Sequence, residues 1–117
     1  MSEFGVSSNR SAGNPGVWVQ EAKIAAVGVR ISEGVSTHGF SINLNPNLSY
    51  FDFIVPCGVP DKSVCSLNSL GIKTIDSNYF KNILLRNFAD IFNLTIKTCS
   101  LDEIHRLYNI KPNITCT

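Results

Sequence analysis

The sequence has little charge and almost no imbalance between the two signs. Only 16% of its 117 residues are charged, and the formal net charge is +1. A typical soluble domain has about 25% charged residues, and nucleic-acid binders usually carry a clear positive excess. No apolar run approaches the roughly 20 residues that cross a bilayer, and no basic stretch followed by an apolar one opens the chain. We therefore expect no nucleic-acid partner, no membrane partner and no signal peptide.

The motifs of common nucleotide and metal sites are also missing. The chain contains neither G-x-x-x-x-G-K-[ST] nor G-x-G-x-x-G, the glycine-rich loops that hold phosphates. Its four cysteines form no C-x-x-C pair, and neither histidine stands at a ligand spacing from them: Cys57, Cys65, Cys99 and Cys116. We expect neither a structural zinc site nor a bound cofactor.

The even cysteine count leaves two interpretations open. Four cysteines in a chain of this length fit a secreted domain with two disulfides, and four Asn-x-Ser/Thr matches would suit a glycoprotein. The same count fits an intracellular protein with one reactive thiol. The cysteines alone do not decide between these interpretations.

What is present is enough apolar sequence for one small domain. Hydrophobic residues make up 44% of the chain, which argues against wholesale disorder. Residues 1–14 are polar, rich in Gly, Ser and Asn, and show no helical or strand period. This composition predicts a flexible N-terminal segment, followed by an ordered domain over residues 15–117.

Strands are predicted in the first part of the chain. Residues 17–19 and the nearly continuous apolar run 23–31 form a predicted hairpin, and the run resembles a strand covered on both faces. Residues 39–45 alternate between apolar and polar, which is the strand period. Residues 64–67 are a further short strand candidate.

The second part of the chain has helical patterns. Asp76 or Ser77 can cap a helix to about Phe92, and an apolar stripe along it indicates core packing: Phe80, Ile83, Leu84, Phe88 and Ile91. A brief strand is predicted over residues 94–98. Ser100-Leu-Asp-Glu103 is a capping box that begins a second helix, which Pro112 stops. The predicted class is α+β, with a mainly antiparallel sheet and helices toward the C-terminus.

Two residues are candidates for chemistry. Cys57 lies between Pro56 and Gly58, where a thiolate would be unobstructed and a backbone N–H could donate to an oxyanion. From this triplet alone, Cys57 is either a structural residue or a nucleophile. Lys23 directly precedes the most apolar run. It either extends its ammonium to water or stabilises a nearby thiolate.

Four blocks, taken in order, resemble the lipoyl(octanoyl) transferases. These blocks are Pro15-Gly-Val-Trp-Val19, Lys23-Ile-Ala-Ala-Val-Gly28, His38-Gly-Phe-Ser-Ile-Asn43, and Ile54-Val-Pro-Cys-Gly58 followed by Val64-Cys-Ser-Leu67. The resemblance is strong from Pro15 to Leu67 and loose over the helical tail. It implies the fold of the lipoate and biotin protein ligases.

The resemblance also implies roles for single residues. Cys57 matches the nucleophile that carries the acyl group as a thioester, and Lys23 matches the lysine that lowers the pKa of this thiol and takes part in proton transfer. The segments implied to bind substrate comprise Ala26, Val27, Gly28, His38, Gly39, Phe40 and Ser41. Without the resemblance, a lone His before Gly would suit a hydrogen-bonded turn residue.

The implied reaction moves an octanoyl group between two proteins without a metal or other cofactor. The donor is octanoyl-acyl carrier protein. The acceptor is a lysine of lipoyl domains in 2-oxoacid dehydrogenase complexes and of the glycine cleavage H protein. The implied location is the mitochondrion in a eukaryote and the cytoplasm otherwise.

The chain also departs from this family. Members carry upstream an Arg-Gly-Gly segment and a His-Gly-Pro-Gly-rich segment, and nothing before Pro15 matches either. Cys65 stands where threonine is usual. We therefore expect the C-terminal half of such a catalytic domain, with an exposed apolar sheet face and an unpaired edge. The alternative is a catalytically inactive fragment that acts at most as a binding module.

Overall fold

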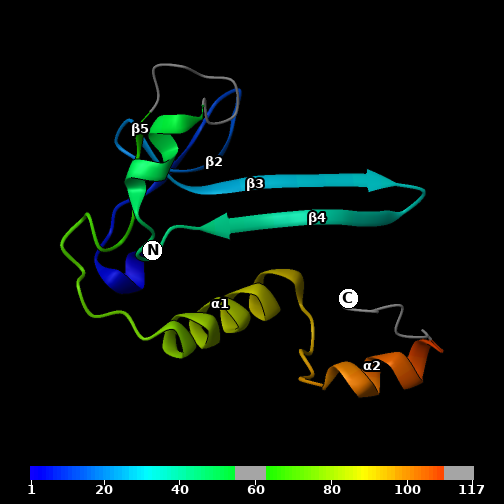
Figure 1. The fold of residues 1–117 in the computed structure, drawn as a ribbon. Coiled ribbons are helices and arrows are strands. Elements are labelled where there is room, and N and C mark those ends of the chain that lie inside the picture. The colour runs from blue at the N-terminus through cyan, green and yellow to red at the C-terminus, as the bar shows by residue number, and fades with distance from the viewer. Residues whose placement is uncertain (55–62, 110–117) are drawn as a thin grey trace, which may run out of the picture. The chain divides into compact units, whose positions relative to one another are not determined.

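The computed structural model describes residues 1–54 and 63–109 of the chain (Figure 1). The chain divides into two compact units, Met1–Ser77 and Asn78–Thr117. In the described residues, the first unit holds the sheet and two short 3-10 helices, and the second holds α2 and all of α1 except its first residue.

The first unit is built on a five-stranded sheet. Its antiparallel strands follow the chain order: β1 (Asn9–Ser11), β2 (Asn14–Val19), β3 (Ala22–Ser32) and β4 (Val35–Ile42). The short strand β5 (Ser63–Val64) pairs in parallel with the start of β3. This mixed sheet, followed by helices, confirms the predicted α+β class.

The predicted hairpin between the first two apolar segments is confirmed, since β2 pairs with β3 through Val19↔Ala22. At the far end of β3, the turn residues Glu33 and Gly34 have φ values of 53° and 78°. Two consecutive positive φ values match the tight turns whose twist suits a hairpin. The result is the long two-stranded ribbon of β3 and β4 (Figure 1).

Two strand predictions need correction. The alternating segment forms a strand over Val35–Ile42 rather than over residues 39–45. Only the first residues of β3 are buried. Further along the strand, Val29 is 54% and Ile31 is 74% exposed. Beyond Ala25, β3 pairs only with β4, and its outer half has no further strand beside it in the described residues.

Residues 1–14 also differ from the predicted loop. A short 3-10 helix, η1 (Ser2–Phe4), is followed by β1, which pairs with β2 through Asn9↔Trp18. The sequence of β1 is polar and does not alternate with apolar residues, so its pattern did not predict a strand. The strand is formed by backbone pairing with β2. The flexibility of this segment and the boundary at residue 15 stay predictions.

The core of the first unit is small and lies where β2, the start of β3 and residues 65–67 meet. Its buried apolar side chains are Trp18, Ile24, Ala25, Cys65 and Leu67. Of the predicted strand 64–67, only Ser63–Val64 is a strand, although Ser66 and Leu67 are buried. A 3-10 helix, η2 (Leu48–Phe53), is capped by the Asn47 side chain and leads towards residue 54.

The second unit contains α1 (Ser77–Phe92) and α2 (Leu101–Tyr108). The predicted capping box is confirmed: Ser100 Oγ accepts from Glu103 N–H at 3.2 Å, and a Glu103 carboxylate oxygen accepts from Ser100 N–H at 2.7 Å. These bonds hold the pKa of Glu103 below its usual value. No strand forms over residues 94–98, which lie within the described part of the chain.

The apolar stripe of α1 is only partly a core face. Phe80 is buried, whereas Ile91 is 76% exposed and Phe88 packs on the neighbouring Phe92 ring at 4.6 Å. Helical spacing alone does not show which part of a stripe is covered. No helix within the described residues is both long enough and apolar enough to span a bilayer.

Candidate functional site

A pocket of about 200 Å³ opens beside the start of the β3–β4 ribbon. Its lining comes from β3, β4, η2 and β5 and consists of Lys23, Ala26, Ser41, Asn43, Phe51, Ile54 and Val64. Most of this lining is apolar or small, and a single cation contributes to it. Such a surface suits an aliphatic group attached to a polar reacting centre.

Lys23 is buried rather than extended to water, since only 7% of it is exposed. Its carbonyl accepts a hydrogen bond from Cys65 N–H at 3.0 Å, which fixes its backbone at the end of β5. Its ammonium lies 4.8 Å from the centre of the Trp18 ring. Little of this lysine is in contact with water, and its role beside a thiolate stays a prediction.

The predicted substrate-binding residues of the ribbon divide between its faces. Ala26 and Ser41 are cross-strand partners and both line the pocket. Val27 and Phe40 form the next pair along the ribbon, and strand alternation turns them to the opposite face. They are 41% and 47% exposed and do not line this pocket.

The remaining predicted ribbon residues lie further from the pocket. Gly28 and Gly39 are partners in β3 and β4, and a Cβ at either position would meet nothing within 4 Å. This pair leaves a stretch of bare backbone two residues beyond Ala26. His38 is exposed, pairs with Val29 and has a φ of 67°.

Cys57, together with its neighbours Pro56 and Gly58, lies outside the described residues. The described residues that flank this segment are informative, because Ile54 before it and Val64 after it both line the pocket. Described residues on both sides of this segment therefore line the same pocket as Lys23.

The two cysteines described here are both free. Cys65 is 7% exposed, its Sγ donates towards Ala22 O at 3.8 Å, and burial raises the pKa of its thiol. Cys99 is exposed. Because two disulfides would require all four cysteines, the two-disulfide interpretation is wrong. Cys116 lies outside the described part of the chain.

Asn43 is a pocket residue that sequence patterns did not single out. Its side-chain NH2 donates to Cys65 O at 3.0 Å, its N–H donates to Ile24 O at 2.9 Å, and its carbonyl accepts from Leu67 N–H at 3.0 Å. These bonds join β3, the end of β4 and residues 65–67. The alternation placed Asn43 on the face of Ser41, but it gave no sign of these partners.

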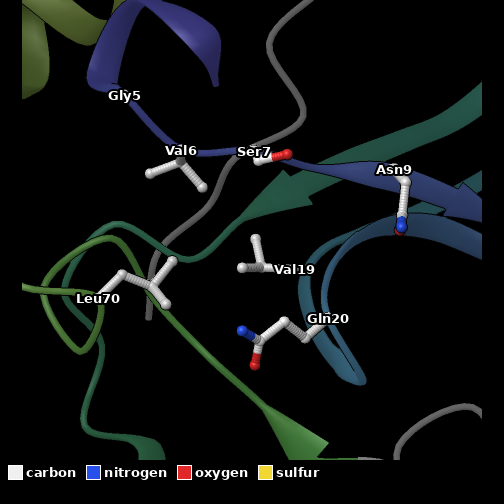
Figure 2. A pocket seen from close by; sticks show the side chains of 7 residues that line it. All are labelled: Gly5, Val6, Ser7, Asn9, Val19, Gln20 and Leu70. Atoms are coloured by element: carbon white, nitrogen blue, oxygen red, sulfur yellow. The ribbon is translucent and has the colours of Figure 1, made fainter.

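A second pocket, of about 490 Å³, lies between the N-terminal segment and the β2–β3 turn (Figure 2). The labelled side chains show that it mixes polar and aliphatic groups, with Gln20 and Leu70 at its border. It contains no titratable side chain. Within residues 1–54 and 63–109, no group of three His, Cys, Asp or Glu side chains is placed to hold a metal ion.

Comparison with known proteins supports the family resemblance. An octanoyltransferase of Christiangramia forsetii is 44% identical over 103 residues, which cover 83% of this chain and 44% of that protein. One of Alkaliphilus metalliredigens is 39% identical over 94 residues, covering 80% of this chain and 43% of that protein. One of Synechococcus elongatus is 34% identical over 110 residues, covering 94% and 47%.

The chain thus spans less than half the length of these curated relatives. Residues 1–89 match the family model of the lipoyl protein ligase A/B catalytic domain. This match includes η1 and β1, so the N-terminal segment belongs to the matched sequence as well. The resemblance that the sequence blocks predicted is confirmed, and the chain belongs to the family of the lipoyl protein ligase A/B catalytic domain.

Proposed function

We propose that this chain supplies the catalytic part of an octanoyltransferase, with Cys57 as the nucleophile and Lys23 as its partner. One observation carries the proposal. Lys23 is a buried cation at a mainly apolar pocket, and the segment bearing Cys57 is flanked on both sides by residues of that pocket. Cys57 follows Ile54 by three residues, a span of at most about 11 Å of extended chain.

The reaction proceeds in two balanced steps. The Cys57 thiolate attacks the thioester carbonyl of the octanoyl donor, a new carbon–sulfur bond forms, and the carbon–sulfur bond to the donor breaks. The Lys23 ammonium gives its proton to the departing donor thiolate and becomes a neutral amine. One thioester replaces another, so this step is nearly neutral in energy. The amine of an acceptor lysine then attacks the Cys57 thioester, an amide forms, and the Cys57 sulfur leaves while Lys23 takes up the amine proton.

The pocket lining supports an aliphatic acyl group. Phe51, Ile54 and Val64 supply apolar surface, and the small Ala26–Ser41 pair leaves space next to them. The bare backbone at Gly28 and Gly39 extends this space along the ribbon. A linear chain placed here would lose contact with water, which favours binding by roughly 0.8 kcal/mol for each CH2 buried.

The proposed partners are two proteins. Octanoyl-acyl carrier protein is the donor, and lipoyl domains of 2-oxoacid dehydrogenase complexes and the glycine cleavage H protein are the acceptors. The relatives' name, octanoyltransferase, supports the acyl group, whereas the choice of donor and acceptors rests on the family resemblance. The proposed location is the mitochondrion in a eukaryote and the cytoplasm otherwise.

A second candidate function is binding without catalysis. The outer part of the ribbon exposes Val29, Ile31 and Phe40, and the chain spans less than half of its relatives. Exposed apolar strands of this kind favour association with another polypeptide. On this alternative, the chain would dock to a partner and form no acyl adduct.

A transfer assay separates the two functions. The chain is incubated with octanoyl-acyl carrier protein and a lipoyl domain, alone and with a polypeptide that corresponds to the uncovered half of a relative. Octanoylated lipoyl domain, lost in Cys57→Ala, supports catalysis. If product forms only after the polypeptide is added, the active site is divided between two chains. Binding of that polypeptide without product supports the binding module.

A further inference from the structure

Trp18 holds a fixed orientation next to Lys23. It is 2% exposed, and its indole Nε1–H donates to Asn14 O at 3.1 Å. Trp18 and Lys23 are direct partners in the β2–β3 ladder, and partners in an antiparallel pair project their side chains to the same face. This pairing brings the Lys23 ammonium to 4.8 Å from the ring centre.

Gly16 has no side chain, and this leaves space for the Lys23 side chain next to its backbone. A Cβ at Gly16 would lie 3.4 Å from both Cδ and Cε of Lys23 and 2.4 Å from Ala25 O. The aliphatic part of Lys23 therefore passes close to the Gly16 backbone before its ammonium reaches the indole. The distal carbons of this long side chain therefore lie close to Gly16, and its ammonium lies close to Trp18.

A lysine side chain is flexible, and a buried one needs partners to hold its charge in one place. The face of an indole attracts an ammonium within about 6 Å of its centre, and Trp does so more strongly than Tyr or Phe. Here the ring is held by the hydrogen bond of its Nε1–H and by the burial of its surface. An aliphatic residue of similar size would pack in the same place without attracting the charge.

We propose that Trp18 is a positioning residue that holds the Lys23 ammonium at the pocket. Trp18 itself does not line the pocket, so it acts through Lys23 and not on the substrate. The inference rests on the proposed function, in which Lys23 assists the Cys57 thiol. The contact between the indole of Trp18 and the ammonium of Lys23 can also be tested without any reaction.

The first test uses the fact that Trp18 is the only tryptophan of the chain. Its fluorescence is compared between the wild type, Lys23→Met, Lys23→Arg and the control Lys73→Met, since Lys73 is an exposed lysine. We expect a shifted emission maximum in Lys23→Met, and wild-type emission in Lys23→Arg and in the control. Unchanged emission in a folded Lys23→Met variant would overturn the contact.

The second test measures the alkylation rate of Cys57 by peptide mass, with the exposed Cys99 as the internal reference. Trp18→Phe and Trp18→Leu both lose the Nε1–H donor, but only Phe keeps a ring face. We expect Lys23→Met and Trp18→Leu to slow Cys57 roughly tenfold, the effect near neutral pH of a one-unit rise in a thiol pKa. Trp18→Phe should stay within about threefold of the wild type.

The outcomes distinguish a failure of the Lys23–Cys57 partnership from a failure of the role of Trp18. If Lys23→Met leaves the Cys57 rate unchanged, the proposed Lys–Cys partnership fails, whatever the fluorescence shows. If Lys23→Met slows Cys57 but Trp18→Leu and Trp18→Phe react at the wild-type rate, the positioning role of Trp18 is refuted. If Trp18→Leu does not fold by circular dichroism, a slow Trp18→Phe variant refutes the role of the ring face.

Discussion

Gly16→Ala should destabilise the first unit more than alanine at any other glycine described in it. Gly16 has a φ of +135°, and an added Cβ would lie 2.4 Å from Ala25 O. The oxygen belongs to the backbone of β3, which is paired on both sides at this point. It therefore has no side-chain rotation through which to move away.

The expected loss has two parts. Forcing a residue with a side chain into such a backbone conformation costs about 1–3 kcal/mol. Relieving the contact with Ala25 O requires β2 and β3 to separate locally, which adds a cost comparable to overpacking, about 1–3 kcal/mol. The sum of about 2–6 kcal/mol is a large share of the roughly 5–15 kcal/mol that stabilises a small domain.

Two other glycines separate these parts. Gly13 has a φ of +76° with nothing within 4 Å of an added Cβ, so Gly13→Ala should show the conformational cost alone, about 1–2 kcal/mol. Gly28 has neither a positive φ nor a neighbour within 4 Å, so Gly28→Ala should be nearly neutral.

Urea unfolding of the three variants, followed by the fluorescence of the buried Trp18, gives the free energies. The expected order of destabilisation is Gly16→Ala, then Gly13→Ala, then Gly28→Ala. Equal stabilities for Gly16→Ala and Gly13→Ala would refute the close approach of β2 to β3, and with it the confined path of the Lys23 side chain.

Three further predictions concern the cap of α2, the buried Cys65 thiol and the exposed ribbon. Ser100→Ala removes the cap of α2 and should cost that helix about 1 kcal/mol, seen as a loss of helical circular dichroism; an unchanged signal would contradict the capping box. Burial raises the pKa of Cys65 above its ordinary value of 9.0, so the folded state keeps the thiol protonated where the unfolded chain ionises, and stability should fall as pH rises beyond about 9. Cys65→Ser should lessen that alkaline loss, and an identical pH dependence in both proteins would count against the burial effect. Ile31→Lys, at a side chain 74% exposed, should change the free energy of unfolding by no more than about 0.5 kcal/mol while weakening binding of the polypeptide that corresponds to the uncovered half of a relative; unchanged binding would show that the ribbon is not the contact surface.

Features that depend on neighbouring residues in the sequence were predictable. The capping box needs only Ser100 and Glu103, which are three residues apart. The β2–β3 hairpin follows from two β-prone segments joined by a short connection, and the α+β class follows from strands that precede helices. Each of these was predicted from local pattern and was confirmed.

Burial was less predictable, because it depends on what lies opposite a residue. The apolar run of β3 has a similar composition along its whole length, yet Ile24 is fully buried and Ile31 is 74% exposed. The difference arises because β2 and β5 flank only the start of β3. For the same reason, sequence patterns could not show that Lys23 is buried against Trp18, because this contact joins two neighbouring strands.

The candidate site was predictable only in part. The family resemblance assigned Lys23, Ala26 and Ser41 to one site, and all three line the same pocket. It did not single out Asn43, whose importance lies in hydrogen bonds to two separate segments, β3 and residues 65–67. Strand alternation, which the resemblance does not state, is the reason that Val27 and Phe40 face away from this pocket.

The most direct test of the central claim is to locate the octanoyl group on the protein. After incubation with octanoyl-acyl carrier protein, with and without the complementary half of a relative, intact mass and peptide mapping identify the acylated residue. We expect one adduct on Cys57 that neutral hydroxylamine releases, as it does a thioester. Cys57→Ser should abolish this adduct, and Cys99→Ser should retain it. An adduct on Cys99, an adduct that persists in Cys57→Ser, or no adduct under either condition would refute the proposed role of Cys57 as the nucleophile.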